Sequence, residues 1–217
     1  TIDIYRGKLN PTKNIISFFT YVSLFPQLVA GPIERASNLL PQVESRRIFS
    51  IPLFKEGILQ IFIGLFRKIV IADTMSVYVD IVYEQPYFYN SFTIILATFL
   101  FAFQIYYDFA GYSDMAIGLA KLLGFKFSQN FNLPYFSSSV SEFWRKWHIS
   151  FSSWLRDYVY IPLGGSKVGS FCTYRNVFLT MLIGGLWHGA AWTYVIWGAL
   201  HGVVLSFEKI VLSLKLK

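Results

Sequence analysis

The side chains in this sequence best suited to chemistry are three histidines, His148, His188 and His201, because imidazole titrates near neutral pH and can act as a general base. His188 lies in the string Leu-Trp-His-Gly-Ala-Ala, within the uncharged stretch 176–207. A titratable ring in so apolar a segment is costly unless it faces protein or water, which makes His188 a functional candidate. The alternative is a structural histidine that donates a hydrogen bond to a carbonyl group of the next helix.

Residues 143–165 predict an amphipathic helix around His148. At 100° per residue, one face carries Trp144, Trp147, His148, Phe151, Trp154, Leu155 and Tyr158. Charged residues occupy the other face, so we expect this helix to lie at a membrane interface or to line a polar cavity. Burial among aromatic rings would keep His148 neutral and able to accept a proton. The alternative is a packed histidine with one bonding partner.

His201 follows His188 by thirteen residues. On one continuous helix the two rings would be roughly 20 Å apart along the axis and could not share a site. We therefore expect His201 to serve helix packing or to sit as a polar tip at the interface.

Two carboxylates, Asp108 and Asp114, lie six residues apart and so do not share a helical face, which makes a paired acid and base a weak interpretation. Asp114 or Ser113 is instead expected to cap a short helix that ends near Gly124. Asp108 lies one turn before Tyr112, where a buried carboxylate could orient a ligand or a tyrosine.

The elements that position these residues belong in a lipid bilayer. The 217 residues are 54% hydrophobic and only 14% charged, against about 45–50% and about 25% for an ordinary soluble domain. Aromatic residues make up 19% of the chain, and the mean hydropathy is +0.47. A single soluble core of this length could not hide so much apolar surface. We expect an all-α, polytopic membrane protein.

Uncharged stretches give the expected spans: residues 14–33, 85–107 and 176–207, with 57–72 as a fourth. The fourth is interrupted by Arg67-Lys68, which suggests that its helix reaches the interface there. Residues 176–207 would form a helix of roughly 48 Å, too long for a hydrocarbon core of about 30 Å. We therefore expect a break at Gly184-Gly185 or at Gly189.

Other functional classes find little support. The net charge of +7 comes from scattered basic residues rather than from a basic stripe, so we expect no nucleic-acid partner. No phosphate-binding loop, nucleophile elbow or metal-ligand spacing occurs, so no metal is expected. The single cysteine, Cys172, cannot form an internal disulfide.

Several long strings appear in a familiar order along the chain. They are FPQLVAGP at 25–32, YYDFAGYSDMAIG at 106–118, NFNLPY at 130–135, SEFWRKWHISFSSWLRDYVYIPLGG at 141–165, TYRN at 173–176 and GLWHGAAWTYVIWGALHG at 185–202. Together they closely resemble the membrane-bound O-acyltransferase family, in its bacterial branch that contains alginate O-acetyltransferase. Family members are longer, so we interpret residues 1–217 as a single domain of this type, a fragment without the family's flanking N- and C-terminal membrane helices.

The resemblance implies a multi-pass enzyme of the bacterial inner membrane whose broken, re-entrant and interfacial helices enclose a central tunnel. It matches His188 to the family's catalytic histidine and His148 to its second histidine. It also implies acetyl-CoA as the donor, with no permanently bound cofactor, and an acceptor that is an exported polysaccharide such as alginate, another polymer or an extracytoplasmic acetyl-relay protein.

If His188 acts as the general base of such an acyl transfer, its imidazole must be neutral. Apolar side chains such as Trp187 and Trp192 would favour that neutral form. His148, Asn176 and Tyr112 are candidates to stabilise the oxyanion or to orient His188, and the sequence does not choose among them. Arg145, Lys146 and Arg156 would hold donor phosphates or extend to lipid headgroups.

Two other classes stay open at this point. One is a structural scaffold for a secretion complex, which explains His188 less well, and the other is a transporter. A polytopic transporter or channel without acyl-transfer chemistry would also use broken helices and intramembrane His and Asp residues. The absence of an inverted repeat and the tryptophan-rich amphipathic segment argue against it.

Overall fold

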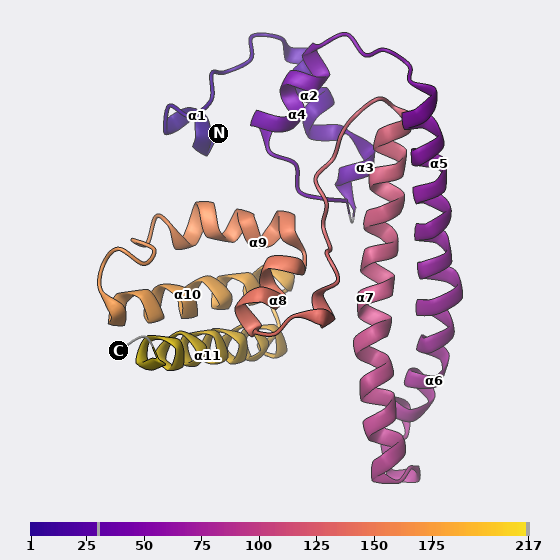
Figure 1. The fold of residues 1–217 in the computed structure, drawn as a ribbon, viewed down its shortest axis with the longest axis vertical. Helices are drawn as coiled ribbons and strands as arrows, with labels where there is room; N and C mark the ends of the chain where they lie inside the picture. Colours follow the sequence, from indigo (N-terminus) through magenta and orange to yellow (C-terminus); the bar gives the residue numbers. More distant parts are fainter. Residues whose placement is uncertain (30, 216–217) are drawn as a thin grey trace. The chain divides into compact units, whose positions relative to one another are not determined.

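The computed structural model describes residues 1–29 and 31–215, and within them every regular element is a helix (Figure 1). The predicted all-α fold class is thereby confirmed. The chain divides into two compact units, Thr1–Gln129 and Asn130–Lys217, which are described separately below. Ala30, in the motif at 25–32, lies outside the described residues.

The first unit begins with four short helices: α1 (Ile2–Tyr5), α2 (Ile15–Ser23), α3 (Phe25–Leu28) and α4 (Ala36–Glu44). Asn14 caps α2 by accepting hydrogen bonds from the amides of Ile16 and Ser17. The prediction of one membrane span over 14–33 is wrong, because α2 and α3 have only nine and four residues and a span needs about 20.

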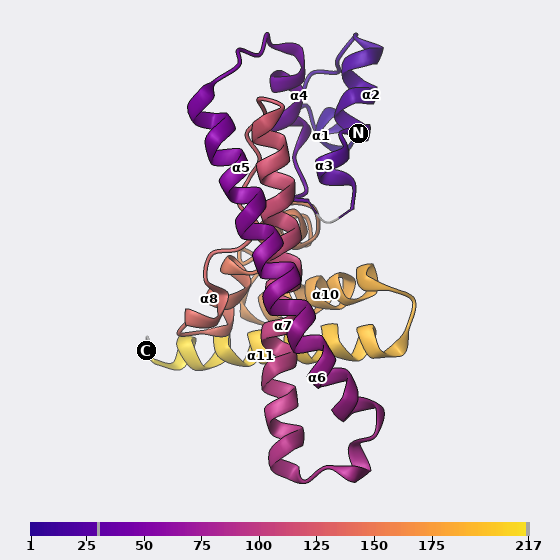
Figure 2. The ribbon, with the colours of Figure 1, turned by 90° about the vertical axis from the view of Figure 1, so that its right-hand side faces the viewer.

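Two long helical segments form the body of the first unit. The first is continuous through α5 (Ile51–Leu65), the π-helical η1 (Phe66–Ala72) and α6 (Asp73–Glu84). After the short turn η2 (Pro86–Phe88), α7 (Ser91–Leu122) runs back along it, as the views in Figures 1 and 2 agree.

Glycines let α5 and α7 approach closely at two places. A Cβ at Gly64 would lie 2.6 Å from the carbonyl oxygen of Gly111, and one at Gly57 would lie 2.8 Å from that of Gly118. Both pairs are spaced by seven residues, so the two contacts repeat along one face of each helix. Small residues at a helix crossing are the usual means of close packing in membrane proteins.

Charged side chains join the same two helical segments near the contact of Gly64 with Gly111. Arg67 pairs with Asp114, and Lys68 pairs with Asp108 and with Asp73, the last at 2.6 Å. The helix continues through Arg67-Lys68, and side chains of α7 and α6 supply partners for both cations. The cap predicted at Ser113 or Asp114 is wrong: both lie inside α7, which is capped by Asn90 and ends before Gly124.

The second unit contains η3 (Pro134–Phe136), α8 (Val140–Lys146), α9 (Ile149–Leu155), η4 (Arg156–Tyr160), α10 (Ser170–His188) and α11 (Trp192–Lys215). The single amphipathic helix predicted over 143–165 is wrong, because the chain bends between α8 and α9 at His148, whose φ is +42°. Backbone hydrogen bonds from Asn132 to Lys146 and from Ile149 to Asn130 hold this bend.

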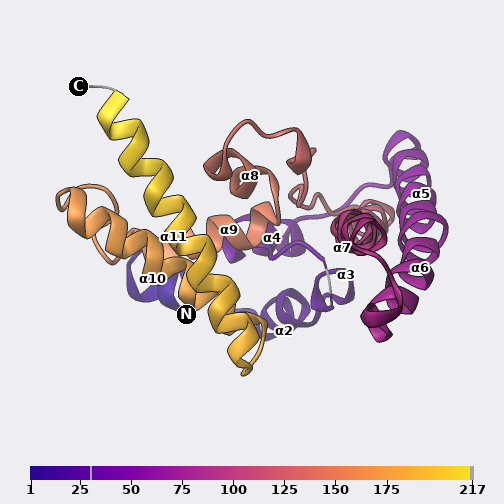
Figure 3. The same ribbon diagram turned by 90° about the horizontal axis from the view of Figure 1, so that it is seen from below.

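The break expected in 176–207 occurs at Gly189, between α10 and α11, and not at Gly184-Gly185. The helices then cross closely, since a Cβ on Gly198 would lie 3.1 Å from the Cα of Gly185. Figure 3 shows this crossing from below.

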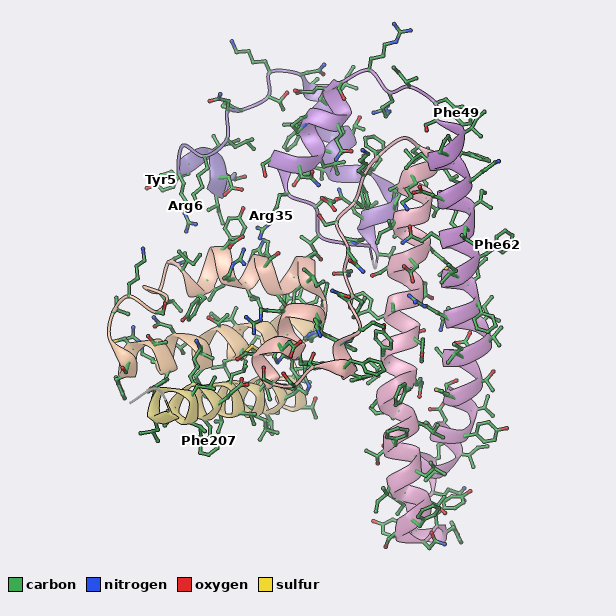
Figure 4. The ribbon with its side chains drawn as sticks, in the orientation of Figure 1. Tyr5, Arg6, Arg35, Phe49, Phe62 and Phe207 are labelled. Carbon is green, nitrogen blue, oxygen red and sulfur yellow. The ribbon has the colours of Figure 1, made fainter. Side chains whose placement is uncertain are left out.

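Within the described residues, two helices are long and apolar enough to cross a membrane: α7 and residues Trp192–Leu214 of α11. Many large apolar side chains of the helical surface are exposed. Figure 4 shows Phe62 projecting from α5 and Phe207 from α11, each 64% exposed. Such surfaces suit contact with lipid rather than with water.

Candidate active site

His188 is the last residue of α10, at the point where the chain turns into α11. Its side chain is exposed and has aromatic neighbours on α10 and α11. The ring centroids of Trp187 and Trp197 are each 5.2 Å away, edge-on, and Tyr194 stacks at 6.0 Å. The turn needs Gly189, because a Cβ there would lie 2.8 Å from Cε2 of Tyr194.

His148 approaches the same place from the bend between α8 and α9, and it is only 4% exposed. Its ring stacks on Phe151 at 5.1 Å and lies 6.2 Å from Trp187. Phe151 and Trp187 are in contact at 4.4 Å, and Phe151 also lies 6.1 Å from His188. The structure thus brings the two candidate histidines to one pair of aromatic rings.

Burial gives the two histidines different properties. It lowers the pKa of His148 to about 3, and the neighbouring His188 adds to the same effect. His148 is therefore neutral at physiological pH. The exposed ring of His188 is the one that a substrate can reach without a rearrangement of the unit.

His201 lies closer to this cluster than the sequence suggested. Its ring is 4.7 Å from Trp197, which in turn contacts His188. The expectation of a separation of roughly 20 Å assumed one continuous helix, and the turn at Gly189 removes that assumption. His201 also packs against Trp144 at 5.1 Å, as expected for a residue in helix packing.

The structure does not gather the remaining candidates of the second unit around His188. Arg145 and Arg156 are exposed and line a separate cavity. Asn176 is fully buried, and its amide nitrogen donates to the carbonyl oxygens of Leu163 and Gly165, which fixes the loop before α10. Trp192, expected as part of an apolar wall, is 80% exposed.

Asp108 and Tyr112 belong to the first unit, where Lys68 contacts both. The ammonium of Lys68 pairs with the carboxylate of Asp108 and lies 5.6 Å from the centroid of the Tyr112 ring. Asp108 thus serves an ion pair, as structural charges inside membrane helices commonly do.

The aromatic neighbours Phe151, Tyr194 and Trp197 complete the site, and only Phe151 was placed near a candidate histidine from the sequence. The spacing of four between Trp197 and His201 was a usable signal, since it puts both on one face of a helix. Among the described residues, no group of three or more His, Cys, Asp or Glu side chains could hold a metal ion.

Comparisons with known proteins show the family of the chain. The model of the membrane-bound O-acyltransferase family matches residues 9–215. The chain is 49% identical over 210 residues to a Pseudomonas putida protein named "Probable alginate O-acetylase AlgI", covering 96% of this chain and 42% of that protein. It is 40% identical over 209 residues to the peptidoglycan O-acetyltransferase of Helicobacter pylori, covering 93% and 40%.

A more distant relative is the teichoic acid D-alanyltransferase of Bacillus subtilis, 29% identical over 205 residues, with 87% of this chain and 51% of that protein covered. The chain is a member of the membrane-bound O-acyltransferase family. More particularly, it is similar to the alginate and peptidoglycan O-acetyltransferases over most of its own length, and it spans about two fifths of theirs.

Proposed function

We propose that this chain carries the acyl-transfer site of a membrane-bound O-acyltransferase. The enzyme moves an acetyl group from a cytoplasmic thioester, acetyl-CoA, to a hydroxyl group of an exported polysaccharide or of a relay protein. The observation that carries the proposal is the exposed imidazole of His188 at a helix break, next to the buried His148 across Phe151 and Trp187.

In the proposed reaction, His188 accepts the proton of the acceptor hydroxyl while that oxygen attacks the thioester carbonyl. The tetrahedral intermediate then collapses, the carbon–sulfur bond breaks, and the protonated His188 returns the proton to the leaving thiolate. General-base assistance of this kind supplies roughly 10²–10⁴-fold in rate, and holding both reactants in place adds to it.

The neutral His148 is suited to orient His188 or to stabilise the oxyanion, because its burial keeps it uncharged. Trp187 contacts both histidines and would shield them from water. Asn176 and Tyr112 are less suited to the oxyanion role. The amide nitrogen of Asn176 already donates hydrogen bonds to two carbonyl groups. The ring of Tyr112 belongs to the first unit, where the ammonium of Lys68 lies over it.

The names of the relatives favour a polysaccharide acceptor. Two of the relatives are named as O-acetylating enzymes of alginate or peptidoglycan, and the third is named as a D-alanyltransferase of teichoic acid. Since the first two share the higher identity with this chain, we propose acetyl as the transferred group and an alginate-like polymer as the acceptor.

The proposed setting is a multi-pass protein of the bacterial inner membrane, in which α7 and α11 are spans. The short α8 and α9 and the break at Gly189 suit interfacial and re-entrant segments around a tunnel, because irregular backbone at membrane depth is tolerated where it is buried in protein or lines a cavity.

The test replaces His188 by Gln in the full-length enzyme and measures transfer of labelled acetyl to the acceptor in membranes. We expect a loss of at least about 100-fold in kcat, from the missing base, with an unchanged amount of protein in the membrane. His201→Gln is the matched control and should keep a rate near that of the wild type. Transfer that survives in the His188 variant contradicts the proposal, and solute flux without transfer would favour a transporter.

A further inference from the structure

The second unit contains a cavity of about 260 Å³ that the proposed reaction does not use. Residues of α8, α9, α10 and α11 line it, and His148 and His188 are not among them. Met181, the lining residue of α10 closest in sequence to His188, precedes it by seven residues, which corresponds to roughly 10 Å along a helix. The cavity is therefore a separate feature of the same unit.

Its inner wall is apolar. Leu155, Val177, Met181 and Leu205 line it, and each is at most 8% exposed. Trp144 also lines it, and its indole Nε1 is buried with no hydrogen-bond partner among the described residues. A buried donor without a partner is unfavourable, so a ligand oxygen that accepted a hydrogen bond from Nε1 would stabilise the site.

Three cations and no acidic residue stand among the lining residues: Arg145, Arg156 and Lys209. Arg156 pairs through Nε with Asp157 at 2.8 Å. For Arg145 and Lys209 the described part of the chain records no ion pair. Three positive charges beside an apolar wall favour a ligand that joins an anionic group to a hydrocarbon chain.

The position of these cations relative to the membrane surface indicates which anionic group the cavity would bind. Lys209 lies five residues before Leu214, the end of the candidate span in α11, and so about 8 Å from that end. A lysine near the end of a span extends its ammonium to the headgroup level. Arg145 and Arg156 come from short helices with exposed charged faces, which suit the same level.

We propose that this cavity binds an anionic phospholipid. The phosphate diester lies among Arg145, Arg156 and Lys209, and the start of one acyl chain covers Met181 and Leu205. Trp144 Nε1 donates a hydrogen bond to an oxygen of the lipid. The site is independent of the acyl-transfer chemistry at His188 and gives the unit a lipid ligand of its own.

The experiment uses the full-length protein, delipidated in a neutral detergent. Binding of dioctanoyl phosphatidylglycerol is measured by native mass spectrometry, with dioctanoyl phosphatidylcholine as the zwitterionic comparison. The double variant Arg156→Gln/Lys209→Gln removes charge, and Leu205→Trp fills the cavity. Lys167→Gln is the matched control, because Lys167 is exposed on the same unit and does not line the cavity.

We expect the wild type and the control to bind phosphatidylglycerol more tightly than phosphatidylcholine. Both cavity variants should lose at least about tenfold in affinity for phosphatidylglycerol, because one removes charge-assisted contacts to the phosphate and the other fills the space for the acyl chain. Trp144→Phe keeps the ring and removes the donor, and it should weaken binding by a smaller factor. Equal binding by wild type and both cavity variants overturns the proposal.

Phosphates also occur on a coenzyme A thioester, so the same variants are assayed for the KM of acetyl-CoA. An unchanged KM together with weakened phosphatidylglycerol binding supports the lipid site. A raised KM with unchanged phosphatidylglycerol binding overturns it and assigns the cations to the donor. Loss of lipid binding in a variant with normal transfer separates this outcome from the test of His188.

Discussion

The two units place polar side chains among apolar helices in different ways. In the first, Asp108 and Asp114 lie within the candidate span α7, and Lys68 and Arg67 pair with them. In the second, His148 and His188 meet around the aromatic rings of Phe151 and Trp187. The ion pairs join helices, whereas the histidines include one exposed ring, that of His188. We infer that the first unit mainly supplies stability and the second the chemistry.

The largest expected effect is at the glycine crossing of the first unit. Gly64→Val would force a side chain against the carbonyl oxygen of Gly111, which lies 2.6 Å from the position of a Cβ. Backbone cannot yield as a side chain does, so we expect a loss of about 3 kcal/mol or more in unfolding free energy. The amount of folded protein in the membrane should fall sharply.

The matched control for that variant is Phe62→Val on the same helix, where the side chain is 64% exposed and introduces no backbone contact. If the two variants were present in the membrane in equal amounts and had equal thermal stability, the glycine crossing would not stabilise the first unit. That result would contradict the role inferred for this unit.

A smaller effect is expected from the ion pairs. Asp114→Asn leaves Arg67 without its carboxylate, and both side chains are partly buried. We expect the unfolding free energy to fall by about 1–3 kcal/mol, with kcat per folded molecule unchanged. The double variant Arg67→Leu/Asp114→Leu should recover much of the stability, since it removes both charges. A lower kcat of the Asp114→Asn variant at normal stability would contradict the comparison, because it would show that the first unit takes part in the chemistry.

The smallest effect concerns pH and the second unit. The pKa of His148 is lowered to about 3 in the fold, while in the unfolded chain it is about 6.5. Below pH 6.5 the unfolded state binds the proton and the folded state does not, so stability falls as the pH falls toward 3. The slope is at most about 1.4 kcal/mol per pH unit. Thermal unfolding of the full-length protein between pH 7 and pH 5 measures it.

In His148→Asn the titrating group is gone, and asparagine tolerates the positive φ of this position. This variant should lose less stability than the wild type over the same pH range. An identical pH dependence of the two proteins would show that His148 is not held neutral by burial.

The sequence singled out the candidate histidines of the second unit better than it predicted their geometry. The strings around His148 and His188 identified both rings, and Gly189 was among the expected breaks. The bend at His148 was missed, because residues 143–161 contain neither glycine nor proline. The bend is held instead by backbone hydrogen bonds to a segment outside this range, from Ile149 N–H to the carbonyl of Asn130 and from Asn132 N–H to that of Lys146. The position of His201 close to the cluster around His188 was also missed, since it depends on the turn at Gly189 between α10 and α11.

In the first unit, the sequence suggested an interface at Arg67-Lys68 and a helix cap at Asp114. The cap is wrong because Asp114 lies inside α7 and pairs with Arg67, 47 residues away, whereas the interface at Arg67-Lys68 stays a prediction. A local pattern cannot report a partner so far along the chain, and an unpaired charge in an apolar stretch then resembles the end of a helix.

What the sequence alone determined is the class of the protein: an apolar, all-helical chain with family motifs that contain its two principal histidines. These follow from composition, from periodicity and from strings of neighbouring residues, which are local properties. Only the tertiary structure decided which side chains meet: Arg67 with Asp114, His148 with His188 across Phe151 and Trp187, and the cations around the cavity of the second unit. These contacts depend on where the helices break and cross, and that is determined by the packing of the whole unit.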